Sequence, residues 1–426
     1  MGGVPIRTSV TEVCVDPLHV YSLSGGPILH VLLNCSTLVK GGALQAAVSF
    51  IGTALARVDH IRWHFVISPN VAVELQKSGL RPQPQQMAVI DESPARSNRS
   101  RKMLQTLVKE INPDLVFTFF GPAYADFETL HLCGVADGWV THGDQWAWRT
   151  VRSPIEAITL LGTILYKAWM FRRADAWVTE SETAKTGLVR RLGISEERIA
   201  VVPNNCADQY LHSEAIAAMP SPHETLNILC LSAYYKHKNL EIIPAVAKEL
   251  QACCPNRQVK FVLTLPGESP GLKKILSQAA ALGVSDRIVN VGPVPVSRGP
   301  EMYQTCQMLF LPSVLETFSA NYPEAMAMGL PIITTNLRFA RDVCGASGAY
   351  FEPMNARDAA LAIGRVCEDE RLWTSLIAEG KRILRTLPNQ AMKYELYRNC
   401  IDELYHRYGS QGRKVLRHDQ VDALNH

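Results

Sequence analysis

The sequence predicts an α/β protein of two domains, each a parallel sheet with helices on its faces. Short apolar runs alternate with helical patterns along the chain, which is typical of parallel sheets. The 426 residues are too many for one ordinary hydrophobic core. The alternation stops in a polar, Pro-containing stretch at 201–225 and then begins again. We therefore expect two sheets joined by a linker.

The first half is expected to begin with a strand at 28–34, "ILHVLLN". Gly41 and Gly42 then precede an Ala-rich run, which predicts a tight turn that opens a helix. A Pro-, Gln- and Arg-rich interval at 81–102 is expected to be an exposed connection. Further strands are expected at 62–68, 115–121, 137–143 and 175–181.

The longest apolar run is "IEAITLLGTILYKAWMF", residues 155–171. It contains one Glu and one Lys and is short for a membrane span. We favour a buried helix. The alternative is a helix that lies in a membrane interface, with Arg172 and Arg173 at lipid phosphates. Residues 1–23 lack the apolar core of a signal peptide, so we expect a cytoplasmic protein, in contact at most with the surface of a membrane.

The second half repeats the alternation of strands and helices. A short helix is expected to open at Pro323 and to end at Gly329, and an amphipathic helix at 390–408, before a mobile polar tail. Strands are expected at 226–232, 258–266, 286–294, 308–313 and 331–335, and further helices at 240–254 and near 270–282.

Charge and cysteine content exclude two classes of protein. The net charge of +3 is small for this length, whereas a dedicated nucleic-acid binder would carry a strong basic bias. The eleven cysteines are scattered, without CxxC or Cys/His ligand spacing. We therefore expect reduced core thiols and no structural metal site.

The stretch "LPSVLETFSANYPEAMAMGLPIITT", residues 311–335, carries the chemistry. An apolar strand ends in a loop with Glu316, and a helix follows with Glu324 in its first turn. The first amides of a helix lack internal partners and favour anions, so this junction suits a diphosphate. The two carboxylates are then available to accept hydrogen bonds from sugar hydroxyls. A nucleotide-sugar combines these features.

This stretch resembles the E-x7-E signature of the retaining glycosyltransferases of family 4. Three further blocks, in order along the chain, are similar to that family: "ADAWVTESETAKTGLVRRLGISEERIAVVPNNCAD", "LSAYYKHKNL" and "GVSDRIVNVGPVP". The resemblance implies the GT-B fold, two Rossmann-like domains whose sheets face a central cleft. It implies an acceptor domain at 1–205, a linker at 206–225, a donor domain at 226–385, and a segment, 386–426, whose helix packs back on the first domain.

The resemblance implies three catalytic residues, Glu316, Lys238 and His142. Glu316 is expected to contact the donor sugar near the reacting carbon. Lys238 is expected to pair with the phosphates and to stabilise the departing charge. His142 is expected to face the reacting sugar. Taken alone, these residues also suit plainer roles: a solvated loop acid, a surface cation and a histidine satisfied at a strand end.

The resemblance also implies the donor contacts. Glu324 is expected to hold the ribose hydroxyls, although an acid there could merely complement the helix dipole. Amides around Thr317, Phe318 and Ser319 are expected to bind the diphosphate. Gly292 is expected beside the nucleotide base.

Two further parts of the sequence bear on phosphate binding. Gly41 and Gly42 are expected to let the backbone approach a phosphate or the acceptor, or simply to form a tight turn. Many members of the family carry an Arg five residues before the donor lysine, and Ala233 stands there in this chain. Lys236 is close in sequence, but an ammonium cannot reproduce the bidentate fork of Arg. We therefore expect donor binding to depend strongly on Lys238.

The expected function is transfer of a sugar from a nucleotide diphosphate-sugar to an acceptor hydroxyl, with retention of anomeric configuration. No Asp-x-Asp cluster follows a strand, so neither a metal ion nor another cofactor is expected. The alternatives are a noncatalytic nucleotide-sugar-binding protein and a nucleotide-sugar epimerase of the same fold. A dinucleotide oxidoreductase is disfavoured, because no G-x-G-x-x-G follows an early strand.

Overall fold

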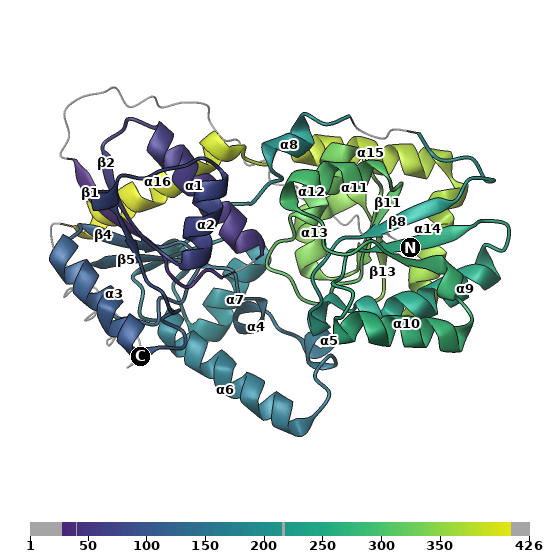
Figure 1. Ribbon diagram of the computed structural model, residues 1–426, viewed down its shortest axis with the longest axis horizontal. Coiled ribbons are helices and arrows are strands. Elements are labelled where there is room, and N and C mark those ends of the chain that lie inside the picture. The colour runs from purple at the N-terminus through teal and green to yellow at the C-terminus, as the bar shows by residue number, and fades with distance from the viewer. Residues whose placement is uncertain (1–27, 40, 215–217, 410–426) are drawn as a thin grey trace, which may run out of the picture.

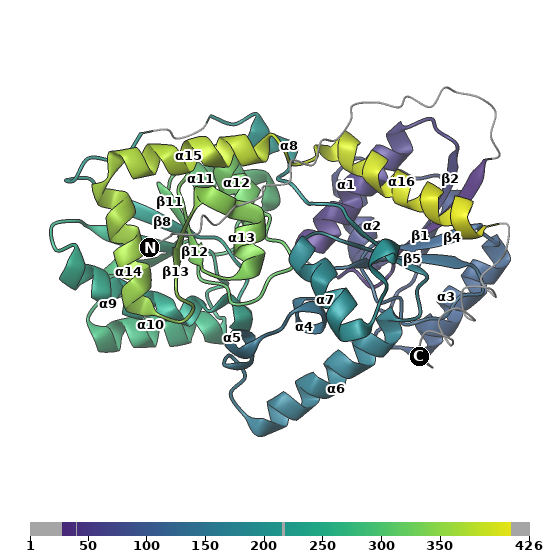
Figure 2. The same ribbon diagram turned by 180° about the vertical axis from the view of Figure 1, so that it is seen from behind.

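The computed structural model describes residues 28–39, 41–214 and 218–409, and these form two parallel sheets with helices on both faces (Figures 1 and 2). The first sheet has seven strands in the order β3-β2-β1-β4-β5-β6-β7. The second has six strands in the order β10-β9-β8-β11-β12-β13. Adjacent strands pair in parallel, as in β1 with β4 and in β8 with β11. The expected fold class is confirmed.

The first domain places its helices between successive strands. Its strands are β1 Leu29–Cys35, β2 Ile61–Ile67, β3 Met87–Val89, β4 Leu115–Thr118, β5 Leu130–Val135, β6 Ala176–Thr179 and β7 Ile199–Val201. Its helices are α1 Gly42–Ala56, α2 Pro69–Lys77, α3 Asn98–Ile111, α4 Gly138–Thr141, α5 Gln145–Trp148, α6 Pro154–Phe171 and α7 Glu182–Leu192.

The second domain repeats the arrangement. Its strands are β8 Leu226–Cys230, β9 Val259–Leu263, β10 Ile288–Asn290, β11 Met308–Leu311, β12 Ile332–Thr335 and β13 Gly348–Phe351. Its helices are α9 Ile243–Cys253, α10 Pro270–Leu282, α11 Gly299–Gln304, α12 Asn321–Met328, α13 Arg338–Cys344, α14 Ala356–Glu368 and α15 Glu370–Leu384. The segment between the sheets forms α8 Asp208–Leu211, which packs against α12.

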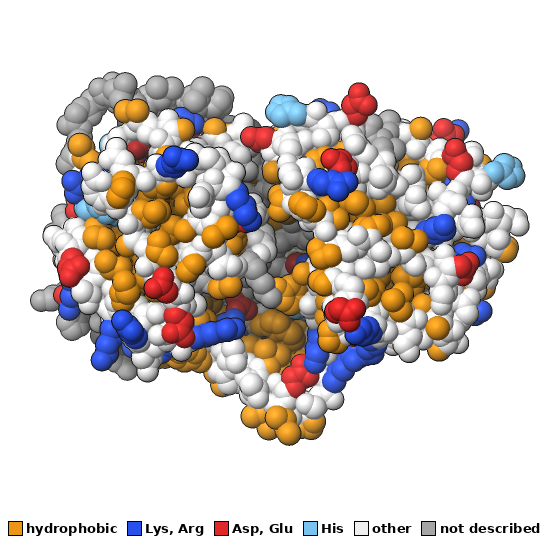
Figure 3. Space-filling view, in the orientation of Figure 1, with side chains coloured by type: hydrophobic (Ala, Val, Ile, Leu, Met, Phe, Trp, Pro, Cys, Tyr) orange, Lys and Arg blue, Asp and Glu red, His pale blue; other side chains and the backbone are white. Residues whose placement is uncertain are grey.

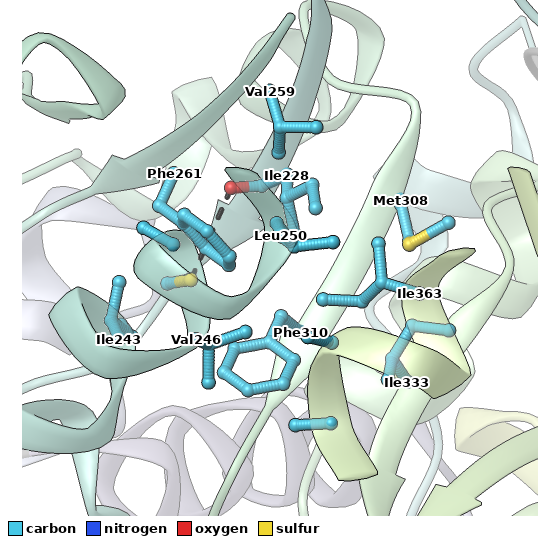
Figure 4. Packing of buried hydrophobic residues seen from close by; sticks show 14 of the residues in the cluster. Ile228, Ile243, Val246, Leu250, Val259, Phe261, Met308, Phe310, Ile333 and Ile363 are labelled. Atoms are coloured by element: carbon cyan, nitrogen blue, oxygen red, sulfur yellow. Dashed lines mark hydrogen bonds between the residues drawn. The ribbon is translucent and has the colours of Figure 1, made fainter. Parts of the chain in front are cut away.

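The core of the second domain shows why these segments fold as they do. Apolar side chains of β8, β9 and β11 meet those of α9 and α14 (Figure 4). Phe310 of β11 lies edge-on to Phe261 of β9, with ring centroids 5.7 Å apart. Both rings are fully buried, and each buried aromatic ring removes a large apolar area from water. This core fixes the strand ends from which the site loops emerge.

The last described helix, α16 Gln390–Tyr408, returns from the second domain and packs against α1, β4 and β5 of the first (Figure 2). Its Tyr394 is buried, accepts a hydrogen bond from Trp63 Nε1 at 3.2 Å and donates one to Asp59 at 2.6 Å. The chain thus crosses between the domains twice, once at each end of the second domain.

Three sequence-based expectations were wrong. Residues 137–143 contain a helix, α4, capped by the Asp137 side chain, and the neighbouring strand is β5, which the sequence analysis missed. The interval 81–102 is not a plain connection, since it contains the edge strand β3 and the start of α3. The expected buried helix at 155–171 is α6, and much of its apolar surface is exposed.

Smaller differences concern boundaries and the tail. Helix α12 begins at Asn321, two residues before Pro323, and ends as expected at Gly329, whose φ is 70°. The expected mobile tail from Gly409 lies almost wholly outside the described residues. Within the described part of the chain, no helix is both long and apolar enough to cross a membrane.

Candidate active site

The site lies where the strand order of each sheet reverses. β1 pairs with both β2 and β4, and β8 pairs with both β9 and β11, so the chain leaves neighbouring strands in opposite directions at these points. In open parallel sheets such a switch point leaves a crevice beyond the carboxyl ends of the strands. The loops after β8 and β11 supply most of the candidate residues, and the surface is hollowed between the domains (Figure 3).

Two of the predicted catalytic residues form an ion pair. Glu316 follows β11 and Lys238 follows β8, and the Lys238 ammonium contacts Glu316 Oε1. The Glu316 side chain is only 9% exposed and the Lys238 side chain 16%, so the pair is largely shielded from water. Shielding strengthens the attraction relative to a surface pair. The arrangement holds a positive charge and a negative charge side by side at the strand ends.

The third predicted catalytic residue reaches this pair from the other domain. His142 follows α4 of the first domain, and its Nε2 lies 2.7 Å from the backbone oxygen of Glu316. A carbonyl oxygen only accepts, so Nε2 carries the proton. Burial lowers the pKa of His142, which keeps the ring neutral at pH 7. Nδ1 lies 2.8 Å from the Thr141 hydroxyl oxygen.

The loop between β11 and α12 offers unpaired backbone donors. Thr317 and Ser319 are buried and Phe318 is half-buried. Within the described chain, the amides of these three residues donate to no protein acceptor. Buried amides are almost always paired, and free N–H groups next to a helix start are donors from which an anion can accept. The predicted diphosphate loop therefore has the free donors that such a ligand needs.

Glu324 lies in α12 and is enclosed by tyrosines. Tyr303 donates to its Oε2 at 2.7 Å, and Tyr210 also contributes a hydrogen bond to the carboxylate. Loss of solvent raises the pKa of Glu324 to about 7, while the two hydroxyls act in the opposite direction. The ionisation of Glu324 at neutral pH is therefore sensitive to any polar or charged group that binds beside it.

Lys238 contacts Glu316, but Lys236 contacts a different acid. It lies with Lys238 in one short 3-10 helix, but its ammonium contacts Glu156 of α6 in the first domain at 2.6 Å. Ala233 is exposed and offers no cation. Lys238 is therefore the cation that directly contacts Glu316 in the described chain.

The predicted glycines occupy strand ends of the two sheets. Gly41, with φ 80° and ψ −165°, caps α1 after β1, and only glycine adopts this conformation readily. Gly42 begins α1 without such a requirement. Gly292 follows β10 and has φ 80°. A Cβ at any of the three would meet no atom within 4 Å, so each borders open space.

A second acid near the pair was missed by the sequence analysis. Glu180 follows β6 and is buried with Lys393 of α16, whose ammonium contacts Asn204 at 2.5 Å. Burial raises the pKa of Glu180 to about 7, against the opposing effects of Lys393 and Asn204 and with a smaller contribution in the same direction from the charge of Glu316. The available sequence signal was the strand end at "VTES", but Lys393 comes from more than 200 residues away in the chain. Tyr210 and Tyr303 were missed for the same reason.

Further polar contacts bring the two domains together. The backbone N–H of Thr183, at the start of α7, donates to Asp342 of α13 at 2.8 Å. A carboxylate at a helix start is favourable. Arg152 contacts Glu241 across the gap, beside the Lys236–Glu156 contact. Together with the His142 contact, these pairs hold the domains close.

A cavity of about 370 Å³ opens between the domains beside the Lys236 contact. Its walls come from both domains, from the segment after α5 and from the loop after β8. Arg149, Arg152, Lys236 and Lys274 give it a basic lining, offset by Glu241. Two of its lining side chains, Asn239 and Gln278, have buried polar atoms without a partner in the described chain.

The fold is shared with solved structures. The structure of Anabaena HepE in complex with UDP-glucose matches with a TM-score of 0.66 and 15% sequence identity. The match covers 88% of this chain and 100% of the other.

Two curated relatives are similar in sequence. The serotype-specific mannosyltransferase WbdA of Escherichia coli is 22% identical over 307 residues, which cover 67% of this chain and 36% of WbdA. The D-inositol 3-phosphate glycosyltransferase of Nocardia farcinica is 26% identical over 208 residues, which cover 46% of this chain and 46% of that protein. The aligned region thus spans less than half the length of either relative.

Two family matches divide the chain as the sheets do. Residues 52–205 match Glycosyltransferase Family 4, and residues 213–383 match Glycosyl transferases group 1. Together the two ranges span more than half of the chain. The first range contains the strands of the first sheet except β1, and the second contains the whole second sheet and the Lys238–Glu316 pair. The chain is therefore a member of the family 4, group 1 glycosyltransferases, with the GT-B fold.

Proposed function

We propose that the protein transfers a sugar from a nucleotide diphosphate-sugar to an acceptor hydroxyl, with retention of anomeric configuration. The observation that carries the proposal is the convergence of Lys238, Glu316 and His142 beside the three unpaired amides at 317–319. This arrangement combines an ammonium and free N–H groups, which bind a diphosphate, with carboxylates that accept from sugar hydroxyls.

Each group has a defined task in the proposed reaction. The acceptor oxygen bonds to the anomeric carbon of the sugar as the bond from that carbon to the diphosphate oxygen breaks. Negative charge grows on the departing phosphate, which takes up the proton of the acceptor hydroxyl. Lys238 and the amides of Thr317–Ser319 stabilise that charge, which lowers the barrier because they act more strongly as the charge develops. These groups supply positive potential from the protein itself, so we propose that neither a metal ion nor another cofactor is required.

His142 and the two acids position the donor. The Nε2–H of neutral His142 is held by the Glu316 carbonyl, and a sugar hydroxyl placed between the domains is an alternative acceptor for it. Glu316 accepts from donor sugar hydroxyls once Lys238 turns to the phosphate. Glu324 accepts from the ribose diol in its ionised form. Because the groups come from both domains, closure completes the site and excludes water.

A noncatalytic nucleotide-sugar-binding protein is the second candidate, and one observation favours it. Ala233 supplies no cation and Lys236 is bound to Glu156, so one ammonium serves the donor phosphates where many relatives are expected to use two cations. Such a protein would bind the donor without consuming it. An epimerase of the same fold would instead isomerise the donor in the absence of acceptor.

The test is a screen of UDP-, GDP- and ADP-sugars with the purified full chain, in the presence and absence of EDTA. Slow donor hydrolysis or transfer that survives EDTA supports the proposal. Binding without turnover supports the second candidate, and an isomerised donor supports an epimerase. Transfer that EDTA abolishes would contradict the proposed metal independence. The anomeric configuration of the product, read by NMR, tests retention.

A further inference from the structure

Helix α6 exposes an apolar stripe that the proposed reaction does not use. Six large apolar or aromatic side chains on it are exposed, from 37% for Tyr166 to 79% for Ile155. They are Ile155, Ile158, Leu161, Leu165, Tyr166 and Trp169. Spacings of three and four residues place most of them along one face of the helix. A stripe of this size on a soluble surface marks an interaction site.

The helix packs on its domain along one side, where Ile164 and Ala168 lie half-buried against the core. No side chain is buried between Pro154 and Trp169, whereas Met170 and Phe171 at its end are buried in the first domain. Both ribbon views show α6 along the lower edge of the molecule (Figures 1 and 2). Apolar side chains gather at the lowest point of the surface, where this helix begins (Figure 3). The stripe can therefore reach a flat surface before the rest of the protein does.

The acidic and basic groups on α6 leave the stripe itself uncharged. Glu156 is held by Lys236, and Lys167 is held by Asp137 at 2.7 Å. Trp169 and Tyr166 lie toward the carboxyl end of the helix, and Arg173 lies 4.2 Å from the Trp169 ring centroid. Aromatic rings next to a guanidinium suit the boundary between acyl chains and headgroups.

Basic side chains flank the same end of the helix. The first turns of α3 carry Arg99, Arg101 and Lys102, and no acid occurs in α3 before Glu110. The Arg101 guanidinium lies 6.0 Å from the Tyr166 ring centroid, which places the start of α3 beside α6. Exposed Arg172 continues the spacing of the stripe beyond Trp169. Phosphate headgroups are the anions that such a rim would meet on an acidic bilayer.

We propose that α6 docks the protein on a bilayer containing anionic phospholipid, with its stripe in the interface and the rim of α3 and Arg172 at the headgroups. A second copy of the chain fits this face less well. In a symmetric dimer the same patch meets itself, so the basic rim would find no acidic patch to complement it on the partner surface. An amphipathic helix of this kind lies in the plane of the interface and does not span it.

The position of α6 links the bilayer to the cleft. Arg152 and Glu156, at the start of the helix, contact Glu241 and Lys236 of the second domain. The apolar stripe thus begins beside the entrance between the domains. This consequence rests on the proposed function: an acceptor anchored in the bilayer would reach the donor without leaving the lipid.

The first experiment measures binding of the full chain to sucrose-loaded vesicles by co-sedimentation. We expect binding to phosphatidylcholine vesicles that contain phosphatidylglycerol, weaker binding to phosphatidylcholine alone, and weakening by salt. The variant Ile158→Glu/Leu165→Glu should bind roughly tenfold more weakly or worse, because two charges enter the apolar face. Unchanged sedimentation of this variant, or none of the parent chain, would overturn the proposal.

A matched control separates the stripe from general effects of charge. Leu361 of α14 and Met392 of α16 are 45% and 53% exposed and lie away from α6. The variant Leu361→Glu/Met392→Glu carries the same charge change and should sediment as the parent does. Loss of binding in both double variants would overturn the assignment to α6.

Two further measurements distinguish the occupant. Trp169 is exposed, so its emission should shift to the blue on vesicle binding, and Trp169→Phe should remove most of that shift. Sedimentation velocity without lipid should show a monomer. If the parent chain is a dimer and Ile158→Glu/Leu165→Glu is a monomer, the stripe binds a second copy of the chain and the proposal is overturned. Vesicle binding is measured without donor or acceptor, so its failure is distinct from failure of the proposed function.

Discussion

The Nε2 proton of His142 is donated to the backbone oxygen of Glu316, 2.7 Å away in the other domain. One hydrogen bond thus connects a histidine of the first sheet to the acid loop of the second. The side chain of the same Glu316 holds Lys238, so three residues from three loops form a single contact network. The network makes the site dependent on how the two domains meet.

Replacement of His142 tests this connection. His142→Ala removes the donor and leaves the Glu316 carbonyl unpaired, so we expect kcat to fall roughly 10- to 100-fold and the free energy of unfolding to fall by about 1–2 kcal/mol. His142→Gln keeps an N–H donor and should retain more of both. Steady-state kinetics and urea unfolding provide the measurements. Equal activity in the parent and His142→Ala chains would remove the histidine from the mechanism.

The raised pKa of Glu324 predicts a pH-dependent stability. Folding raises this pKa from 4.5 to about 7, so the folded chain binds a proton that the unfolded chain releases. Below pH 4.5 the carboxyl is protonated in both the folded and the unfolded chain and does not oppose folding. As pH rises from 4.5 to 7, the unfolded chain loses this proton first, so the free energy of unfolding falls. Glu324→Gln has no charge to bury. We expect it to stabilise the fold by about 2 kcal/mol more at pH 8 than at pH 5.5.

Thermal or urea unfolding of both chains at the two pH values provides the test. Glu379→Gln, at an exposed pair with Arg382, serves as the control and should show no such gain at high pH. A gain for Glu324→Gln that is the same at pH 5.5 and pH 8 would mean that the carboxyl does not titrate near 7.

The same ionisation predicts that the KM for donor falls as pH rises from 6 to 8, since the ribose diol donates to the ionised form.

Gly41 and Gly42 form a matched pair at the start of α1. Both border open space, but Gly41 alone has a positive φ. Gly41→Ala should cost roughly 1–3 kcal/mol of unfolding free energy from backbone strain, and Gly42→Ala should be nearly neutral or stabilising. Urea unfolding of the two variants measures the difference. Equal stabilities would show that the loop relaxes, and a loss of activity in Gly42→Ala alone would indicate close approach of a ligand at that position.

Much of the fold was predictable because buried parallel strands are continuous apolar runs. The runs at β1, β8 and β11 are of this kind, and the Pro–Gly limits of α12 were close to those observed. A strand was expected at 137–143, where the structure has α4, because Trp139 and Val140 belong to a helix too short to show a helical period. Strand β5 was missed although it is fully buried, because a histidine and a glycine interrupt its apolar pattern.

The site was predictable where its residues follow one another in a loop. Glu316 and the amides at 317–319 share one strand-to-helix connection, and their proximity follows from the sequence. The partners of Glu324, Glu180 and Lys236 come from distant segments, so the tyrosines, Lys393 and Glu156 required the three-dimensional arrangement. The exposure of α6 was hidden for a related reason. A run that is apolar on most of its faces does not reveal which face the domain covers.

The most direct test compares Lys238→Ala with Lys236→Ala in donor turnover. The two lysines lie in one short 3-10 helix, yet only Lys238 contacts Glu316, and Lys236 contacts Glu156. We predict that Lys238→Ala lowers kcat roughly 100- to 1,000-fold, as for loss of a group that stabilises developing charge, while Lys236→Ala retains most of the activity. Equal kcat in the parent and Lys238→Ala chains would contradict the account.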